Sequence, residues 1–489
     1  MTVREWAGRF QESIAARPGV SLRIGVIVLL LLASLILVPA AALGERAAWL
    51  VLGSPLLLGA LVILLRWPGL VFPLAVIVGM LVPFSVGTGT QTGINASILL
   101  LAVALGLWAV DLAVGRAELR LDVSPTTLPL LALVGVSILA LGFGQLPWFV
   151  ARPAPLLAQL GGLGIILLSA AAFLLAAQRL ESLRPLQWMV YLFIGLGAVF
   201  ISMMLVPSLR REATGLFQRA VLDATFWIWI VALGTGQALL NRDLPRRWRL
   251  ACGLVALGAI YFTIIDRQSW TSGWLPGLVV IGTILATRRP RWLLIGVVVL
   301  LVGAILAPQG IQGILMGGDN PYSLETRLEA WRILLQIVRV NPILGLGPAN
   351  YYNYTPLFDI LGYSVSFNSH NNYVDMLAQT GLAGLGCFLW SLATIGRVLW
   401  RERDRVPEGF PRAYADSALA GLAGMVVAGM LGDWLIPFVY NIGMEGLRAG
   451  ILAWMFLGAA VGLERIYPFR ETSSSASPAP DGTRPPPAA

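Results

Sequence analysis

Apolar runs of about 20 residues follow one another along most of the chain, and short arginine-bearing segments separate them. A helix of this length spans the hydrocarbon core of a bilayer, and a helix satisfies its own backbone hydrogen bonds in lipid. Only 12% of the 489 residues are charged, whereas a soluble domain carries about 25%. The sequence therefore predicts an all-α integral membrane protein.

We expect about 14 transmembrane helices. The run 274–287 is short, and the stretch 48–85 allows a different division. The predicted spans are 23–43, 48–65, 67–85, 94–115, 126–145, 155–177, 185–206, 223–240, 250–265, 274–287, 292–307, 373–396, 416–436 and 446–463.

The arginines orient these helices. The chain has no lysine, so all 34 basic residues other than histidine are arginines. If the N-terminus is cytoplasmic and the spans alternate, 24 arginines fall on the cytoplasmic side and 10 on the other. This agrees with the positive-inside rule and makes both termini cytoplasmic. Membrane topology thus explains the basic net charge of +9 without a nucleic-acid partner.

Five segments follow from this topology. A cytoplasmic arm, 1–22, precedes a membrane domain of about 11 helices, 23–307. The large external loop 308–372 is far longer than a plain connection needs, and it contains a predicted amphipathic helix, 323–340. About three further helices occupy 373–463. The tail 464–489 is rich in Ser and Pro after residue 472, a composition typical of disorder.

The only histidine, His370, lies where the external loop enters the next predicted span. Histidine suits proton transfer near neutral pH, although an interfacial histidine without a catalytic task fits the pattern equally well. Cys252 and Cys387 fall in apolar runs and are expected to be small buried side chains. Two cysteines and one histidine cannot form a four-ligand zinc site without carboxylates, so we expect no metal.

Several arginines lie on the external side, where the positive-inside rule disfavours them. In the helix 323–340, Glu325, Glu329, Arg332, Gln336 and Arg339 form one polar stripe. Arg327 lies on the opposite, apolar face, where its charge needs a counter-charge or an anionic ligand, unless the side chain extends to water. Arg219 and Arg267 flank other spans. Each could bind a diphosphate or anchor its helix at the membrane interface.

The run His370-Asn371-Asn372-Tyr373-Val374-Asp375-Met376-Leu377, followed by Gly381-Leu382-Ala383-Gly384, resembles the signature of the O-antigen ligase/polymerase superfamily. The preceding blocks, Arg327-Leu328-Glu329-Ala330-Trp331 and Pro342-Ile343-Leu344-Gly345-Leu346-Gly347, look like the same family's upstream region. Together they cover about 60 residues in this order.

The resemblance implies a GT-C-like fold and a bacterial inner-membrane glycosyltransferase without a cofactor. Its donor would be an undecaprenyl-diphosphate-linked glycan and its acceptor a lipid or glycan hydroxyl, with the site on the external (periplasmic) face among membrane lipids. By position His370 matches the family's base, and Asn371 would orient it or a sugar. Arg327, Arg267 and, more loosely, Arg219 match arginines that bind the diphosphate. Asp266 replaces the serine of the family's Ser-Arg motif beside Arg267 and could neutralise that arginine.

The motifs leave the acceptor open. A ligase, a polysaccharide polymerase and a protein O-oligosaccharyltransferase of this superfamily share them. A flippase or transporter of lipid-linked sugars can also have 14 spans, but it predicts charges within the spans. Tyr351, Tyr352 and Tyr354 would either stack on sugar rings or lie at the membrane interface.

The predicted topology can be tested by cysteine accessibility. Single cysteines at positions 320 and 370 should react with a membrane-impermeant reagent from outside, and those at 245 and 405 only from the cytoplasm. The background would lack Cys252 and Cys387. The opposite pattern at any one position would contradict the arrangement.

Overall fold

The computed structural model describes residue 59 and residues 62–87, 93–114, 124–268, 270–306 and 321–468. The predicted arm 1–22 and the first span, 23–43, lie outside the described residues. So do most of the second span and of the tail, and the start of the predicted external loop.

Almost every described element is helical, so the chain is an all-α membrane protein, as predicted. Each predicted span from 67–85 onward coincides with a helix. These helices are α4 (Val71–Leu81), α5 (Ala96–Ala113), α6 (Thr127–Phe143), α7 (Leu156–Arg179), α8 (Leu183–Leu205), α10 (Ala224–Leu239), α11 (Arg246–Tyr261), α12 (Thr271–Arg288), α13 (Pro290–Leu306), α17 (Asn372–Arg405), α18 (Phe410–Leu431) and α19 (Leu447–Ile466). Seven helical segments in the described part are long and apolar enough to cross a membrane: α5, α7, α8, α17 and α18, α11 with its continuation to Asp266, and α19 with the turn before it.

Short elements connect these helices. The helical ones are η1 (Pro68–Leu70), η2 (Pro207–Leu209), α9 (Arg210–Leu216), η3 (Arg219–Leu222), the π-helical turn η4 (Phe262–Asp266), α15 (Pro321–Val338), α16 (Tyr351–Tyr354), η5 (Thr355–Leu357) and η6 (Met444–Gly446). A two-stranded antiparallel hairpin, β1 (Ser85–Gly87) and β2 (Gly93–Asn95), pairs Val86 with Ile94.

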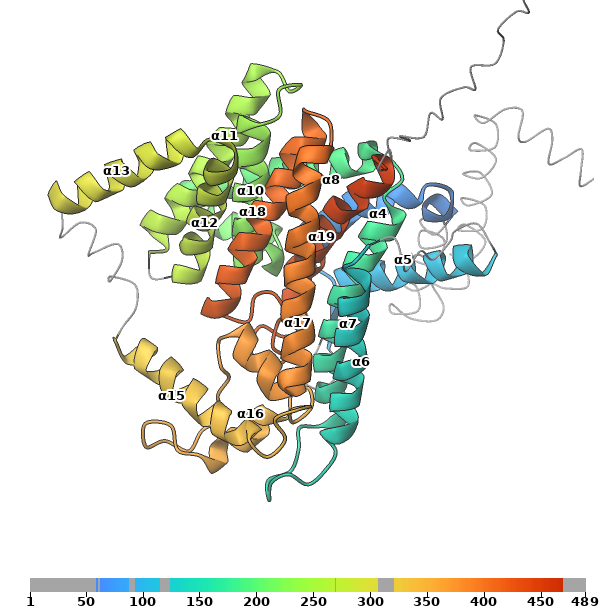
Figure 1. The fold of residues 1–489 in the computed structure, drawn as a ribbon, viewed down its shortest axis with the longest axis vertical. Coiled ribbons are helices and arrows are strands. Elements are labelled where there is room, and N and C mark those ends of the chain that lie inside the picture. Colours follow the sequence, from blue (N-terminus) through green and yellow to red (C-terminus); the bar gives the residue numbers. More distant parts are fainter. Residues whose placement is uncertain are drawn as a thin grey trace, which may run out of the picture.

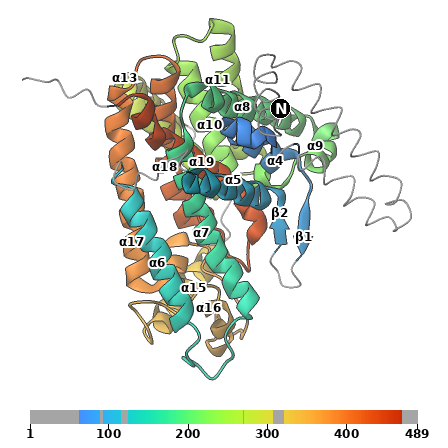
Figure 2. The same ribbon diagram turned by 90° about the vertical axis from the view of Figure 1, so that its right-hand side faces the viewer.

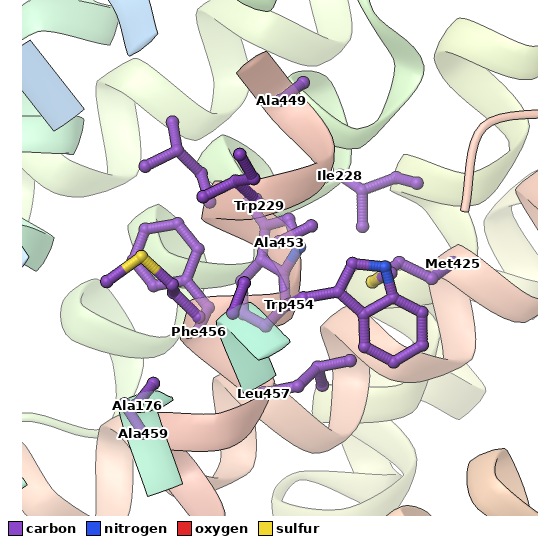
Figure 3. Packing of buried hydrophobic residues seen from close by; sticks show 14 of the residues in the cluster. Ala176, Ile228, Trp229, Met425, Ala449, Ala453, Trp454, Phe456, Leu457 and Ala459 are labelled. Atoms are coloured by element: carbon purple, nitrogen blue, oxygen red, sulfur yellow. The ribbon is translucent and has the colours of Figure 1, made fainter. Parts of the chain in front are cut away.

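Helix α19 forms the centre of the bundle, because the whole apolar window between Met444 and Ile466 is buried. Figure 3 shows its Trp454 and Phe456 among side chains of neighbouring helices, including Trp229 of α10 and Met425 of α18. The Trp229 and Phe456 rings lie 4.8 Å apart. A helix that is apolar on all sides must be surrounded by other helices or by lipid, and α19 contacts α7, α17, α18, α4 and α10.

The described part of the predicted external loop that precedes α17, residues 321–371, is called the cap below. Its helices α15 and α16 lie together at one end of the bundle in both views, and α15 contacts α17 (Figure 1, Figure 2). The cap has its own apolar core, which includes Leu334 and Ile337 of α15, Tyr351, and Phe438 from the connection between α18 and α19. The helix predicted at 323–340 is α15, displaced by two residues at each end.

Helix α17 is broken at Gly381, which has φ 67° and ψ −167°. The turn Pro342–Gly347 docks into this break. Its Leu346 and Gly347 N–H groups donate to the carbonyls of Ala378 and Gln379, and its Pro342 and Ile343 carbonyls accept from Leu382 and Ala383. All four donor–acceptor distances lie between 2.8 and 3.0 Å. The predicted span 373–396 thus consists of two helical pieces that meet at Gly381. The first piece is bonded to the cap through the turn Pro342–Gly347.

Two glycines allow this close approach. Gly345 and Gly381 both have φ of +67°, a backbone region that side chains with a Cβ disfavour. A Cβ at Gly381 would lie 2.2 Å from the Ile343 carbonyl oxygen, and one at Gly345 would lie 2.6 Å from the Gly381 nitrogen. The glycines of the two sequence blocks therefore meet each other.

We predict that Gly381→Ala destabilises the fold by roughly 2 kcal/mol or more, because the new Cβ meets backbone and the left-handed conformation becomes costly. The matched control is Gly386→Ala in the same helix, where a Cβ would have nothing within 4 Å. Thermal unfolding in detergent should show a lower Tm for the first variant and an unchanged or higher Tm for the second. Equal Tm values would contradict the docking.

Candidate active site

His370 occupies a strained backbone position. Its φ of 49° places it in the left-handed region, where residues other than glycine are uncommon. Such strain persists only when the surrounding structure fixes it, and it concentrates at functional sites. The residues on both sides of His370 are buried, whereas part of the His370 side chain is exposed.

Both neighbours of His370 are held by the protein. Trp331 of α15 donates from Nε1 to the Ser369 carbonyl oxygen at 2.7 Å. Asn371 is the N-cap of α17: its Oδ1 accepts from the N–H groups of Tyr373 and Val374, and its Nδ2 donates to the Met430 carbonyl at 3.3 Å. The amide of Asn371 is thus used within the protein and orients the chain next to His370.

Asn372 fixes the segment between α18 and α19. Its Nδ2 donates to the Ile436 carbonyl at 2.7 Å, and its Oδ1 accepts from the Leu435 N–H at 2.8 Å. These two bonds bring the connection 432–443 against the start of α17.

A cavity of about 320 Å³ lies beside His370. Residues of α15, of the stretch before α17 and of the connection 432–443 form its wall. They are Thr326, Arg327, Ala330, Tyr352, Ile360, Ser366, Phe367, Asn368, His370, Tyr440 and Asn441. The described residues of the wall include no carboxylate, and this part of the chain has no group of three or more His, Cys, Asp or Glu suited to a metal ion. It offers hydroxyl and amide groups, one guanidinium and one imidazole, a set that fits an anionic or polyhydroxylated ligand.

Arg327 faces this cavity, on the side of α15 opposite the polar stripe. Glu325, Arg332, Gln336 and Arg339 of that stripe are exposed and Glu329 is half-buried, which confirms the stripe as an outer face. No described residue forms an ion pair with Arg327, so its charge is available to a ligand.

The surroundings of His370 favour its neutral form. Partial burial by the cavity wall and, second, the positive charge of Arg327 lower the pKa of His370 from its ordinary value of 6.5. An imidazole with a lowered pKa is unprotonated at neutral pH, which is the state that a proton acceptor requires.

Arg219 and Arg267 lie outside this cavity. Arg219 begins η3 next to Asp223, and Arg267 follows the π-helical turn η4; both are exposed. Asp266, the residue that departs from the family motif, forms an ion pair with Arg210. Within the described residues Arg267 has no ion-pair partner, so Asp266 does not neutralise it.

The three tyrosines after Gly347 have different environments. Tyr351 and Tyr354 are 0% and 1% exposed and pack in the cap core, so they neither contact sugars nor lie at a membrane interface. Tyr352 lines the cavity and stacks on Tyr440 with ring centroids 4.6 Å apart. Sequence reasoning did not identify Tyr440 or Asn441, because no motif marks the connection 432–443.

Comparison with known proteins agrees with the motifs. Residues 252–389 match the model of the O-antigen ligase family. This range contains Arg267, Arg327 and His370, while Arg219 and the connection 432–443 lie outside it. The match confirms the resemblance to the O-antigen ligase/polymerase superfamily. No curated protein matches the chain.

The effect of Arg327 on His370 can be measured directly, because a chain with one histidine gives one imidazole signal. With ¹³C-labelled histidine, an NMR titration should give a pKa below 6.5 in the wild type. Arg327→Gln should raise this pKa, because a neighbouring positive charge is removed. The control Arg332→Gln changes an arginine of the same helix whose side chain is 70% exposed and pairs with Glu329, and the pKa should stay at the wild-type value. An unchanged pKa in Arg327→Gln would contradict the geometry.

Proposed function

We propose, from the match of residues 252–389 to the O-antigen ligase family, that this protein transfers a glycan from an undecaprenyl-diphosphate-linked donor to an acceptor hydroxyl. The reaction takes place at the outer face of the bacterial inner membrane, on a GT-C-like scaffold of about 14 spans with both termini in the cytoplasm. The cap and the arginines around it form the substrate site.

The observation that carries this proposal is the shared cavity of Arg327 and His370. A guanidinium group with no ion-pair partner among the described residues is suited to bind phosphate oxygens in a bidentate way. An imidazole with a lowered pKa is suited to accept a proton. Both groups face one space large enough for part of a substrate.

The proposed reaction is a single displacement. His370 accepts the proton of the acceptor hydroxyl while that oxygen attacks the anomeric carbon of the donor. The bond between this carbon and the diphosphate oxygen breaks, and its electron pair leaves with the lipid diphosphate. Attack opposite the leaving group inverts the anomeric centre. Arg327 stabilises the charge that develops on the diphosphate, and this leaving group needs no metal ion in the proposal.

Arg219 and Arg267 would bind the part of the donor that extends toward the membrane. Both side chains are exposed at ends of helices that adjoin the proposed outer face. The ion pair between Arg210 and Asp266 supports this role for Arg267, because the acidic residue next to Arg267 in the sequence is already paired with another arginine.

The distribution of charge favours an enzyme over a transporter of lipid-linked sugars. None of the described helices that correspond to predicted spans has a charged residue in its middle third. Asp111, which lies within a predicted span, is near the end of α5 and pairs with Arg179 at 2.8 Å. A transport path through the membrane would be lined by charged or polar groups at its centre.

We predict that His370→Ala lowers the rate of transfer about 10²–10⁴-fold, the usual contribution of a positioned base. Donor binding should remain, because it depends on the arginines. Wild-type turnover should fall with decreasing pH as the imidazole becomes protonated, with an apparent pKa below 6.5, and it should survive EDTA.

The measurement uses purified protein with an undecaprenyl-diphosphate glycan and three separate acceptors: a lipid A core, a second lipid-linked glycan, and a peptide containing serine and threonine. The productive acceptor distinguishes a ligase, a polymerase and a protein-directed transferase. Near-wild-type turnover of His370→Ala would refute the base assignment.

A further inference from the structure

A buried chain of hydrogen bonds leads from the cap core to His370. The Tyr351 hydroxyl donates to Asp375 Oδ1 at 2.5 Å. The Ser369 hydroxyl lies 2.7 Å from the same oxygen and 2.8 Å from the Asn371 carbonyl oxygen, and it accepts from the Asn371 N–H at 2.9 Å. Ser369 is therefore held through its hydroxyl by Asp375, in addition to the bond from Trp331 to its carbonyl.

The side chains that form these hydrogen bonds are buried. Tyr351 and Ser369 are 0% exposed and Asp375 is 1% exposed, so none of them can touch a substrate. The Tyr351 ring stacks on Phe438 at 4.8 Å, which fixes the direction of its hydroxyl. Burial and, second, the Asp375 carboxyl raise the pKa of Tyr351 well above its usual value, so the phenol keeps its proton and remains a donor.

A buried carboxyl group is costly even when it is hydrogen-bonded. Only one oxygen of Asp375 has partners in the described structure, and Oδ2 has none. An apolar side chain here would leave the buried hydroxyls of Tyr351 and Ser369 without this partner. The polar group is better explained by the geometry that it imposes on Ser369 and hence on the residue that follows.

We infer that Tyr351 and Asp375 are positioning residues that act through Ser369 to hold His370 in its left-handed conformation and direct its imidazole into the cavity. The expected effect on the transfer rate rests on the proposed function, whereas the expected effect on the conformation of His370 does not. The left-handed conformation costs about 1–2 kcal/mol at a residue with a Cβ, so residue 370 would relax if Ser369 were released.

The test compares two tyrosines of the same core. Tyr351→Phe removes the hydroxyl that bonds Asp375. Tyr354 is equally buried, but its hydroxyl bonds none of Tyr351, Asp375 and Ser369, so Tyr354→Phe is the matched control. In the first variant the single histidine signal in the NMR spectrum should shift or divide, and its pKa should change. In the second variant both should match the wild type.

Kinetics provide the catalytic readout. Tyr351→Phe should lower kcat roughly 10- to 100-fold with little change in KM, as expected for a misplaced catalytic group. Asp375→Asn keeps an oxygen that can accept both bonds, so it should lose less activity than Asp375→Ala. A uniform loss in all variants with a lower Tm would indicate a purely structural role and overturn the inference.

The outcomes separate this inference from the proposed function. A changed histidine signal with unchanged kcat in Tyr351→Phe would keep the positioning role and remove His370 from catalysis. An unchanged histidine signal and an unchanged kcat in Tyr351→Phe would overturn the positioning role, whatever His370→Ala shows. Trp331→Phe, which removes the other bond to Ser369 and keeps an aromatic ring, is the second variant if Tyr351→Phe fails to fold.

Discussion

The exchange of backbone hydrogen bonds at the break in α17 is the contact on which the site depends. In an unbroken helix the carbonyls of Ala378 and Gln379 would pair with the N–H groups of Leu382 and Ala383. The turn Pro342–Gly347 supplies partners to all four groups instead. Buried backbone groups need partners, so the break is stable only while the turn is docked. The cap and the helix therefore depend on each other.

This contact also sets the position of the catalytic candidates. The first part of α17, from Asn372 to Thr380, begins two residues after His370, and the turn at 342 begins four residues after the end of α15. Docking the turn into the break brings α15 toward the residues before α17, where Trp331 bonds the Ser369 carbonyl. Arg327 lies one helical turn before Trp331 and faces the cavity. A guanidinium and an imidazole more than 40 residues apart in sequence thus line one space.

The sequence predicted the parts that follow from local pattern. Apolar length identified the helices, and a spacing of three and four residues identified the exposed stripe of α15 and the inward direction of Arg327. Other parts depend on tertiary contacts that no local pattern encodes. The apolar run continues through Gly381, so its length gave no sign of the break. The partner of Asp266 is Arg210, 56 residues away, and proximity in sequence pointed to Arg267 instead. Tyr440 and Asn441 reach the cavity because Asn372 binds the connection that carries them.

In the family-like motif some residues form hydrogen bonds within the protein and one lines the cavity, and the residue types explain this difference. Asparagine carries both a donor and an acceptor, and Asn371 and Asn372 use both to join α17, Met430 and the connection 432–443. Serine is small enough to be buried with its hydroxyl bonded, as Ser369 is. The buried and bonded residues around His370 leave its imidazole as the group of this run that lines the cavity. The side chains on either side of His370 fix the backbone that carries it, and the proposed role of His370 as a base requires such alignment. The motif residues next to His370 therefore contribute a fixed backbone, held by the hydrogen bonds of Ser369 and Asn371.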